Sequence, residues 1–145
     1  FSDLLSVLLV YSNIDSFYIA KFNQIRHPLT FFKIDNYWSI IDPYYGIYFT
    51  NNVRLFASIE DIKNEKWQTS NLDYEKINRL NYKDTFENKF NNYDELKNYY
   101  NTIFYYLPTS NEIDQTNIFY RGGRSYTQNP LGRIKYEIYK KIKGY

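Results

Sequence analysis

The feature that most constrains the fold is a pair of apolar runs separated by two turn-forming residues. Residues 29–34 and 37–41 are rich in aromatic and β-branched side chains, which favour β-strands. Asp35 and Asn36 lie between the runs, and both residue types tolerate the positive φ angles that a two-residue hairpin turn requires. The sequence therefore predicts an antiparallel hairpin over this stretch.

The register of that hairpin brings two polar side chains, His27 and Asp42, toward each other. With a two-residue loop Ile34 faces Tyr37, and Asp42 then lies opposite Leu29. Side chains alternate between faces along a strand, so His27 and Asp42 share one face. Diagonal neighbours of this kind have Cα atoms roughly 7–8 Å apart. A four-residue loop keeps this alignment, whereas a three-residue loop places the two side chains on opposite faces.

A histidine beside an aspartate suits proton transfer. The carboxylate fixes the tautomer of the ring and stabilises the imidazolium, so the imidazole can accept and return a proton. His27 is the only histidine in the chain, and the chain contains no cysteine. No thiol nucleophile can therefore come from these residues, and one His without Cys gives no metal-ligand pattern. We expect neither a metal nor a cofactor.

The first eleven residues predict a helix. Leucines at positions 4, 5, 8 and 9 have helical spacing and give one apolar face. The chain does not begin with methionine, and Phe1 leaves little room for an N-terminal cap. We therefore expect residue 1 to be a cut inside a larger protein, with more chain ahead of it. A thiol just ahead of Phe1 would gain thiolate character from the helix dipole.

The residues around this pair follow the order of a known superfamily. A helical stretch over residues 1–9 is followed by a short connection (12–15) and a strand (16–20). His27 comes next, and then a strand that contains Trp38 and ends in Asp42-Pro43. Gly46 and an aromatic segment up to Phe49 follow. In this order the chain resembles the second half of a transglutaminase-like core, the papain-related superfamily of Cys–His–Asp enzymes. The resemblance covers residues 1–67. Trp38 itself is expected to pack in the core.

The resemblance implies an α+β fold with a papain-like antiparallel sheet, an N-terminal helix packed on it and C-terminal helical additions. It implies acyl transfer or hydrolysis at an amide or peptide bond by a cysteine ahead of Phe1. His27 would act as general base and acid, and Asp42 would orient its ring. The cysteine is the motif element that this sequence lacks. The alternative is a catalytically inactive binding or scaffold module, and the chain alone is expected to be inert in either case.

Later segments are mainly helical in pattern. Residues 58–61 form a capping-box-like start that leads into 62–67. Residues 68–92 have the composition of irregular connections. Asn92 is a plausible cap for a helix that continues to residue 107, with acidic residues in the first turn and proline after the end.

Two features lie near the end of the chain. Residues 129–143 predict a last helix, with proline at its first position, isoleucines at helical spacing and a solvated basic face. Residues 120–126 carry Arg121 and Arg124 around two glycines, which could suit a carboxylate or phosphate. No P-loop lysine follows, and an ordinary turn is the favoured interpretation.

Composition narrows the classes of function. At 145 residues and 17.7 kDa the chain fits one domain, with residues 1–67 as the core part and 68–145 as a mostly helical extension. Aromatic residues at 21% oppose disorder, and no stretch approaches the roughly 20 apolar residues of a membrane span. A net charge of +2 is too small to indicate nucleic-acid binding. A peptide or protein substrate is the expected partner.

Overall fold

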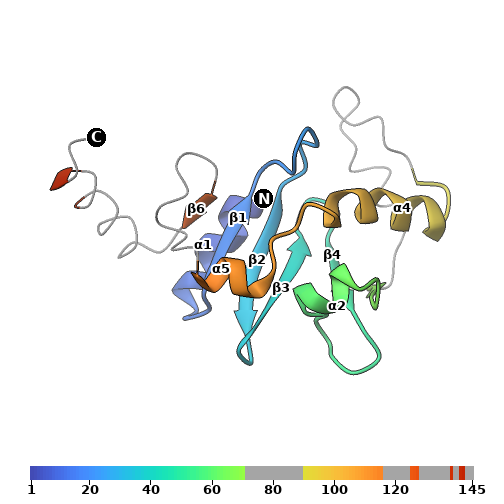
Figure 1. Cartoon of the computed structure of the whole chain (residues 1–145), viewed down its shortest axis with the longest axis horizontal. Helices are drawn as coiled ribbons and strands as arrows, with labels where there is room; N and C mark the ends of the chain where they lie inside the picture. Colours follow the sequence, from blue (N-terminus) through green and yellow to red (C-terminus); the bar gives the residue numbers. More distant parts are fainter. Residues whose placement is uncertain (71–89, 116–124, 128–137, 139–140, 143–145) are drawn as a thin grey trace.

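The structure is a computed structural model of the chain, and it describes residues 1–70, 90–115, 125–127, 138 and 141–142. Its architecture is α+β, as the sequence predicts: an N-terminal helix, an antiparallel sheet and helices that follow the sheet (Figure 1). The order of elements is α1 (Ser2–Tyr11), β1 (Ser16–Ile19), β2 (Leu29–Ile34), β3 (Tyr37–Asp42), β4 (Ile47–Thr50), α2 (Ile59–Lys63), β5 (Gln68–Thr69), α4 (Tyr93–Phe104), α5 (Ser110–Gln115) and β6 (Ser125–Thr127).

The strands form one sheet in the order β5-β4-β3-β2-β1-β6, and neighbouring strands are antiparallel. At its centre the predicted hairpin is confirmed, because Ile34 pairs with Tyr37 across a two-residue turn. Asp35 and Asn36 have φ angles of 47° and 64°, the left-handed conformation that this tight turn requires.

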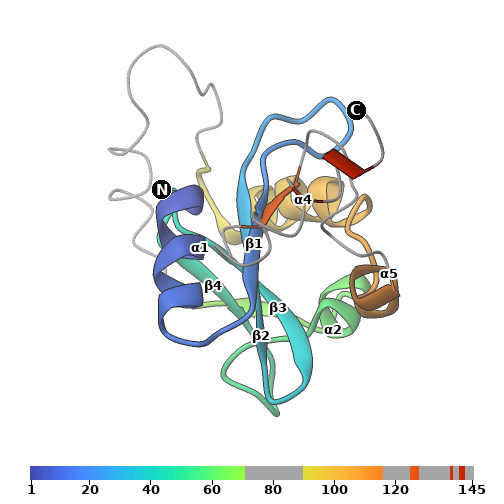
Figure 2. The same cartoon turned by 90° about the vertical axis from the view of Figure 1, so that its left-hand side faces the viewer.

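Helices cover both faces of the sheet. Figure 2 shows α1 on one side of the strands and α2, α4 and α5 on the other side. The burial pattern agrees, because consecutive residues are buried in the central strands, four in β2 (residues 29–32) and three in β3 (residues 38–40). A strand with only one covered face would instead alternate between buried and exposed residues.

The prediction of helix α1 is confirmed, and the side that packs on the sheet is not its leucine face. Ser2 and Ser6 are buried against the sheet, whereas Leu4 is 61% exposed and Leu8 is 54% exposed. Small serines let the helix approach the strands closely, and Ser2 forms hydrogen bonds with Pro28, just before β2, and with Thr30 in β2, described below. The spacing of the leucines therefore predicts the helix but not the side that packs on the sheet.

The main core lies between the sheet and helix α4 and is largely aromatic. The Phe49 ring on β4 lies 4.9 Å from the Tyr100 ring and 5.0 Å from the Phe104 ring, measured between centroids. Trp67 packs at the edge of the same cluster, 5.2 Å from Phe104. Trp38 is buried, as predicted, and its Nε1 donates to Asp114 at 2.8 Å.

The predicted caps of two helices are confirmed. Ser58 accepts a hydrogen bond from the Asp61 amide, and the Asp61 side chain accepts one from the Ser58 amide, which completes a capping box for α2. The Asn92 side chain accepts from the amide of Glu95 and begins α4. Both helices end before the predicted residues 67 and 107, α2 at Lys63 and α4 at Phe104.

Other predicted segments lie partly or wholly outside the described residues. The irregular segment 68–92 is described only at its ends, where Gln68–Thr69 form β5. In the 120–126 loop Arg121 and Arg124 lie outside them, and residues 125–127 pair with β1 as β6. Within the predicted helix 129–143 only residues 138, 141 and 142 are described; they are helical, and Ile138 and Ile142 are exposed.

Candidate active site

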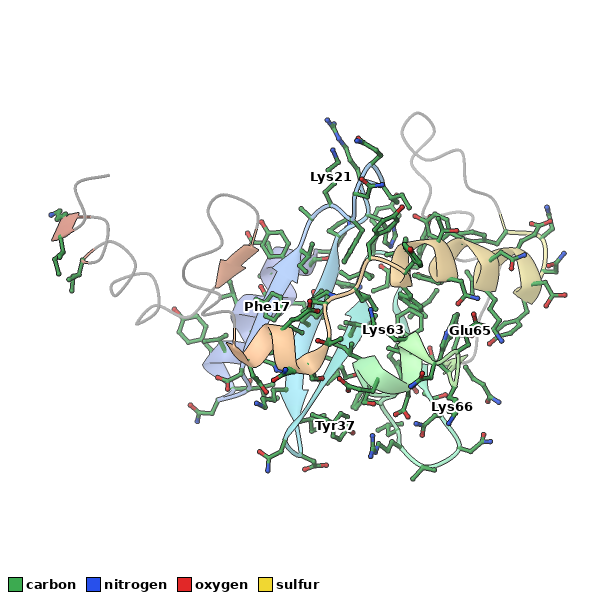
Figure 3. All side chains as sticks on the ribbon, in the orientation of Figure 1. Phe17, Lys21, Tyr37, Lys63, Glu65 and Lys66 are labelled. Atoms are coloured by element: carbon green, nitrogen blue, oxygen red, sulfur yellow. The ribbon has the colours of Figure 1, made fainter. Side chains whose placement is uncertain are left out.

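His27 and Asp42 lie at the end of the sheet opposite the hairpin turn. His27 is in the connection between β1 and β2, two residues before β2 begins, and Asp42 is the last residue of β3. Figure 3 marks the two ends: Lys21 lies in the β1–β2 connection, and Tyr37 lies beside the hairpin turn. Antiparallel pairing places the start of β2 next to the end of β3, so the pairing of these two strands brings both residues to the same end of the sheet.

The predicted contact between the two side chains is confirmed. His27 Nε2 lies 2.6 Å from Asp42 Oδ2, and both residues have an exposed fraction of 0%. A buried carboxylate is costly unless it is paired and hydrogen-bonded. The network around Asp42 meets that requirement.

Within the described part of the chain, Asp42 accepts four hydrogen bonds, two at each oxygen. At Oδ1 it accepts from the backbone amides of Tyr44 at 2.9 Å and Tyr45 at 3.1 Å, which closes the turn after β3. At Oδ2 it accepts from His27 and from the Tyr100 hydroxyl on helix α4. The carboxylate therefore joins the hairpin, the following turn and a helix that lies far away in the sequence.

In the described residues, four tyrosine rings surround the His27 ring. Tyr45 stacks on it, with centroids 5.5 Å apart and an interplanar angle of 22°. Tyr99, Tyr100 and Tyr44 contact it edge-on at 5.5, 6.1 and 6.5 Å. These contacts and the Asp42 hydrogen bond fix the plane of the imidazole.

The remaining ring nitrogen determines what the pair can do. His27 Nδ1 is buried and has no hydrogen-bond partner within the described part of the chain. A buried N–H without a partner costs about 1–3 kcal/mol, so the favoured tautomer carries its proton on Nε2, where Asp42 accepts it. Nδ1 then presents a lone pair that can accept a proton.

The N-terminus of helix α1 is attached to the residues that follow His27. The Ser2 hydroxyl donates to the Pro28 carbonyl at 3.0 Å, and the Thr30 hydroxyl donates to the Ser2 carbonyl at 3.1 Å. Phe1 is the N-cap residue, makes no side-chain cap hydrogen bond and is 80% exposed. The positive end of the α1 dipole therefore lies beside the strand that follows His27.

Two tyrosines of the site hold their protons strongly. Burial raises the pKa of Tyr100 well above its usual value, and the negative charge of Asp42 and the hydrogen bond to it raise it further. The pKa of Tyr45 is raised too, first by burial and then by Tyr99 and Asp42. Both hydroxyls are thus neutral at physiological pH, and Tyr100 acts as a donor to the carboxylate.

Sequence reasoning missed all four tyrosines of the site, which are residues 44, 45, 99 and 100. Tyr100 lies on the apolar face of α4 together with Leu96 and Ile103, so its spacing indicates only a core position. Its hydroxyl partner is Asp42, 58 residues earlier in the chain, and no local pattern encodes that distance. The hydrogen bonds from the backbone amides of Tyr44 and Tyr45 to Asp42 could have been predicted, because an aspartate side chain often accepts hydrogen bonds from the amides of the residues that follow it.

Other kinds of site have less support. The described residues contain no group of three or more His, Cys, Asp or Glu side chains that could hold a metal ion. In the same part of the chain, no helix is long and apolar enough to span a membrane. A separate pocket of about 630 Å³ is lined in part by Lys66, Trp67 and Lys97, and its lining does not include His27 or Asp42. Lys66, just beyond the end of α2, is labelled in Figure 3.

Comparison of the chain with protein-family models, curated proteins and solved structures finds no match.

Proposed function

We propose that His27 and Asp42 are the proton-transfer half of a transglutaminase-like thiol site, with the nucleophile supplied by a cysteine ahead of Phe1 in the full protein. The observation that carries the proposal is the hydrogen-bond pattern of His27. Nε2 is bound to Asp42 at 2.6 Å, and Nδ1 has no partner among the described residues. A general base requires this combination of one oriented nitrogen and one available nitrogen.

The position of helix α1 supports the location of the nucleophile. Ser2 and Thr30 tie the start of α1 to the strand that begins just after His27. A thiol at a helix N-terminus gains thiolate character from the dipole, and a neighbouring imidazolium strengthens the effect. The papain-like form of the α+β fold, with its leading helix packed on an antiparallel sheet, belongs to this same proposal.

The proposed reaction is acyl transfer from an amide or peptide. His27 Nδ1 takes the thiol proton, and the thiolate sulfur attacks the carbonyl carbon. The C–N bond then breaks, and the imidazolium gives its proton to the leaving amine. In hydrolysis, water adds to the thioester, loses a proton to Nδ1 and releases the acid and the thiol. Asp42 holds the ring through Nε2 in every step.

Peptide hydrolysis is the proposed outcome, because water is always present. Transfer to an amine requires an amine-binding site, and no such site is evident among the described residues. The proposed partner is therefore a peptide or protein substrate. Neither outcome needs a metal or an organic cofactor for the proton transfers.

The full burial of His27 favours a second candidate, a non-catalytic binding or scaffold module with the same fold. A buried and fully bonded Asp42 also serves as a structural junction between the hairpin and α4. In this candidate the His27 ring acts as a hydrogen-bonded core residue. The two candidates differ in whether a thiol at the start of α1 responds to His27.

A single added cysteine tests the proposal, because the chain has no other cysteine. The test chain carries a cysteine immediately ahead of Phe1, and the matched control is Tyr11→Cys, at the opposite end of α1. Tyr11 is 74% exposed and Phe1 is 80% exposed, so access to reagent is similar. Each variant is made with His27 intact and with His27→Gln, and alkylation by iodoacetamide is timed at pH 6.

The expected difference is about tenfold. If the thiol pKa falls by ~2 units from its ordinary value of about 8.5, the thiolate fraction at pH 6 rises roughly 75-fold. The lower basicity of that thiolate reduces its reactivity by about tenfold, which leaves roughly tenfold faster alkylation than in Tyr11→Cys. His27→Gln should remove most of this advantage. Equal rates at the two positions, or a rate unaffected by His27→Gln, would overturn the proposal in favour of the module.

A further inference from the structure

Helix α4 lies beyond residues 1–67, yet it contributes a hydroxyl to the His27–Asp42 pair. Tyr100 has an exposed fraction of 0%, and its hydroxyl donates to Asp42 Oδ2. The same oxygen accepts from His27 Nε2. The helix is thus connected directly to the charge that orients the imidazole.

We propose that Tyr100 is a positioning residue that sets how strongly Asp42 holds the protonated His27 ring. This inference rests on the proposed function and extends it, because it places a regulating contact on α4. Tyr100 contacts neither a substrate nor a thiol in this account; it acts through Asp42.

Competition for one oxygen gives the physical basis. Each donor to Oδ2 withdraws electron density from it, so the Tyr100 hydroxyl reduces the charge available to the imidazolium. Without that hydroxyl Oδ2 interacts with His27 alone. The imidazolium is then held more tightly and returns its proton less readily to a leaving amine.

Packing keeps the Tyr100 hydroxyl in place. The Tyr100 ring stacks on Phe104 at 5.4 Å and meets Phe49 edge-on at 4.9 Å. Leu96 and Ile103 on the same helix are also fully buried. A ring enclosed on these sides cannot turn its hydroxyl away from Asp42 without disturbing the core, so the contact is a fixed property of the fold.

Tyr45 provides a matched control. Its ring stacks directly on His27, and its buried hydroxyl has no hydrogen-bond partner among the described residues. Tyr45→Phe therefore removes the same atom from the same aromatic surroundings, but it removes no hydrogen bond. Any effect of ring polarity on His27 appears in both variants, whereas an effect through Asp42 appears only in Tyr100→Phe.

The experiment is a pH titration of the His27 ring by NMR in the full chain, in which one histidine gives one set of signals. We expect Tyr100→Phe to raise the titration midpoint by at least ~0.5 pH unit, about threefold in proton affinity. Tyr45→Phe should leave the midpoint within ~0.2 pH unit of the unsubstituted chain. Equal midpoints for all three chains, or an equal shift in both variants, would overturn the inference.

The same variants in the chain with a cysteine ahead of Phe1 separate this inference from the proposed function. If alkylation depends on His27 but its pH profile is the same in Tyr100→Phe, the positioning role fails and the thiol site stands. If alkylation never depends on His27, the thiol site fails. The titration shift then still decides whether Tyr100 acts on the His27–Asp42 pair.

Discussion

Replacing Asp42 by asparagine gives a specific prediction for both stability and tautomer. The amide keeps the shape of the carboxylate but offers one acceptor oxygen and one donor NH₂ group. The backbone amides of Tyr44 and Tyr45 can only donate, so the oxygen of the new side chain must stay with them. The NH₂ group then points at His27 and Tyr100, which must both become acceptors.

For His27 this means a change of tautomer. Nε2 accepts from the amide only if the ring proton moves to Nδ1. The Tyr100 hydroxyl can rotate to accept, so it adjusts without moving the ring. Asp42→Asn should thus preserve the fold and reverse the protonation of the two ring nitrogens. The lone pair that the proposed reaction needs on Nδ1 would be lost.

The cost in stability follows from the four bonds that lose their charge. Hydrogen bonds to a charged group are worth about 1.5–3 kcal/mol, and neutral ones about 0.5–1.5 kcal/mol. Exchanging four of the first kind for four of the second costs about 4–6 kcal/mol of bonding, which the smaller desolvation cost of a neutral amide offsets in part. Asp42→Ala should cost more, because it leaves four donors in and around the core without an acceptor, at roughly 1–3 kcal/mol each. That sum rivals the ~5–15 kcal/mol total stability of a domain.

Urea unfolding and nitrogen NMR of the single histidine measure both effects. We expect Asp42→Asn to fold with a reduced unfolding midpoint and a proton on Nδ1, and Asp42→Ala to fail to fold cooperatively. If Asp42→Ala is as stable as Asp42→Asn, the four-donor account of Asp42 is wrong. If the tautomer in Asp42→Asn matches that of the unsubstituted chain, the orienting role of Asp42 is wrong.

Three further predictions concern neighbouring contacts. Tyr100→Phe should lower the free energy of unfolding by about 1.5–3 kcal/mol because it loses a hydrogen bond to a charged group, whereas Tyr45→Phe should leave that free energy unchanged or higher. Urea unfolding midpoints compare the two variants, and equal losses would contradict the hydrogen bond assigned to Tyr100. Ser58→Ala should cost about 1 kcal/mol through loss of the α2 cap, and a thermal unfolding curve identical to that of the unsubstituted chain would contradict it. The hydrogen bond from Trp38, and after it the one from Lys33, lowers the pKa of Asp114. The stability that the Asp114 charge contributes is therefore present above the unfolded pKa of about 3.9, and it is lost as pH falls through the lower folded pKa. Asp114→Asn should therefore be less stable at neutral pH and equal to the unsubstituted chain in strong acid, and a stability gap independent of pH would contradict this.

Local chemistry explains why the hairpin could be predicted. Asp35 and Asn36 determine the turn, the turn determines the register, and the register brings His27 to Asp42 without information from elsewhere in the chain. The caps at Ser58 and Asn92 are equally local. In each case the interacting residues lie close in sequence, and their chemistry permits few other arrangements.

Tertiary contacts explain what could not be predicted. The leucines of α1 indicate a helix, but the buried side is decided by how closely Ser2 and Ser6 allow the helix to approach the sheet. Tyr100 reaches Asp42 only because α4 packs across the strands, and its spacing is that of any core residue. The sequence thus predicts the His27–Asp42 pair, and only the fold reveals the Tyr100 hydroxyl that is bonded to it.

The most direct test of the central claim is the protonation of the His27 ring in the unsubstituted chain. The chain has one histidine, so nitrogen–proton NMR at neutral pH identifies each ring nitrogen without ambiguity. The account predicts a proton on Nε2 that exchanges slowly with water because Asp42 binds it in the core, and an unprotonated Nδ1. A proton on Nδ1, or ring signals that match a solvent-exposed histidine, would contradict the claim that Asp42 holds His27 ready to accept a proton.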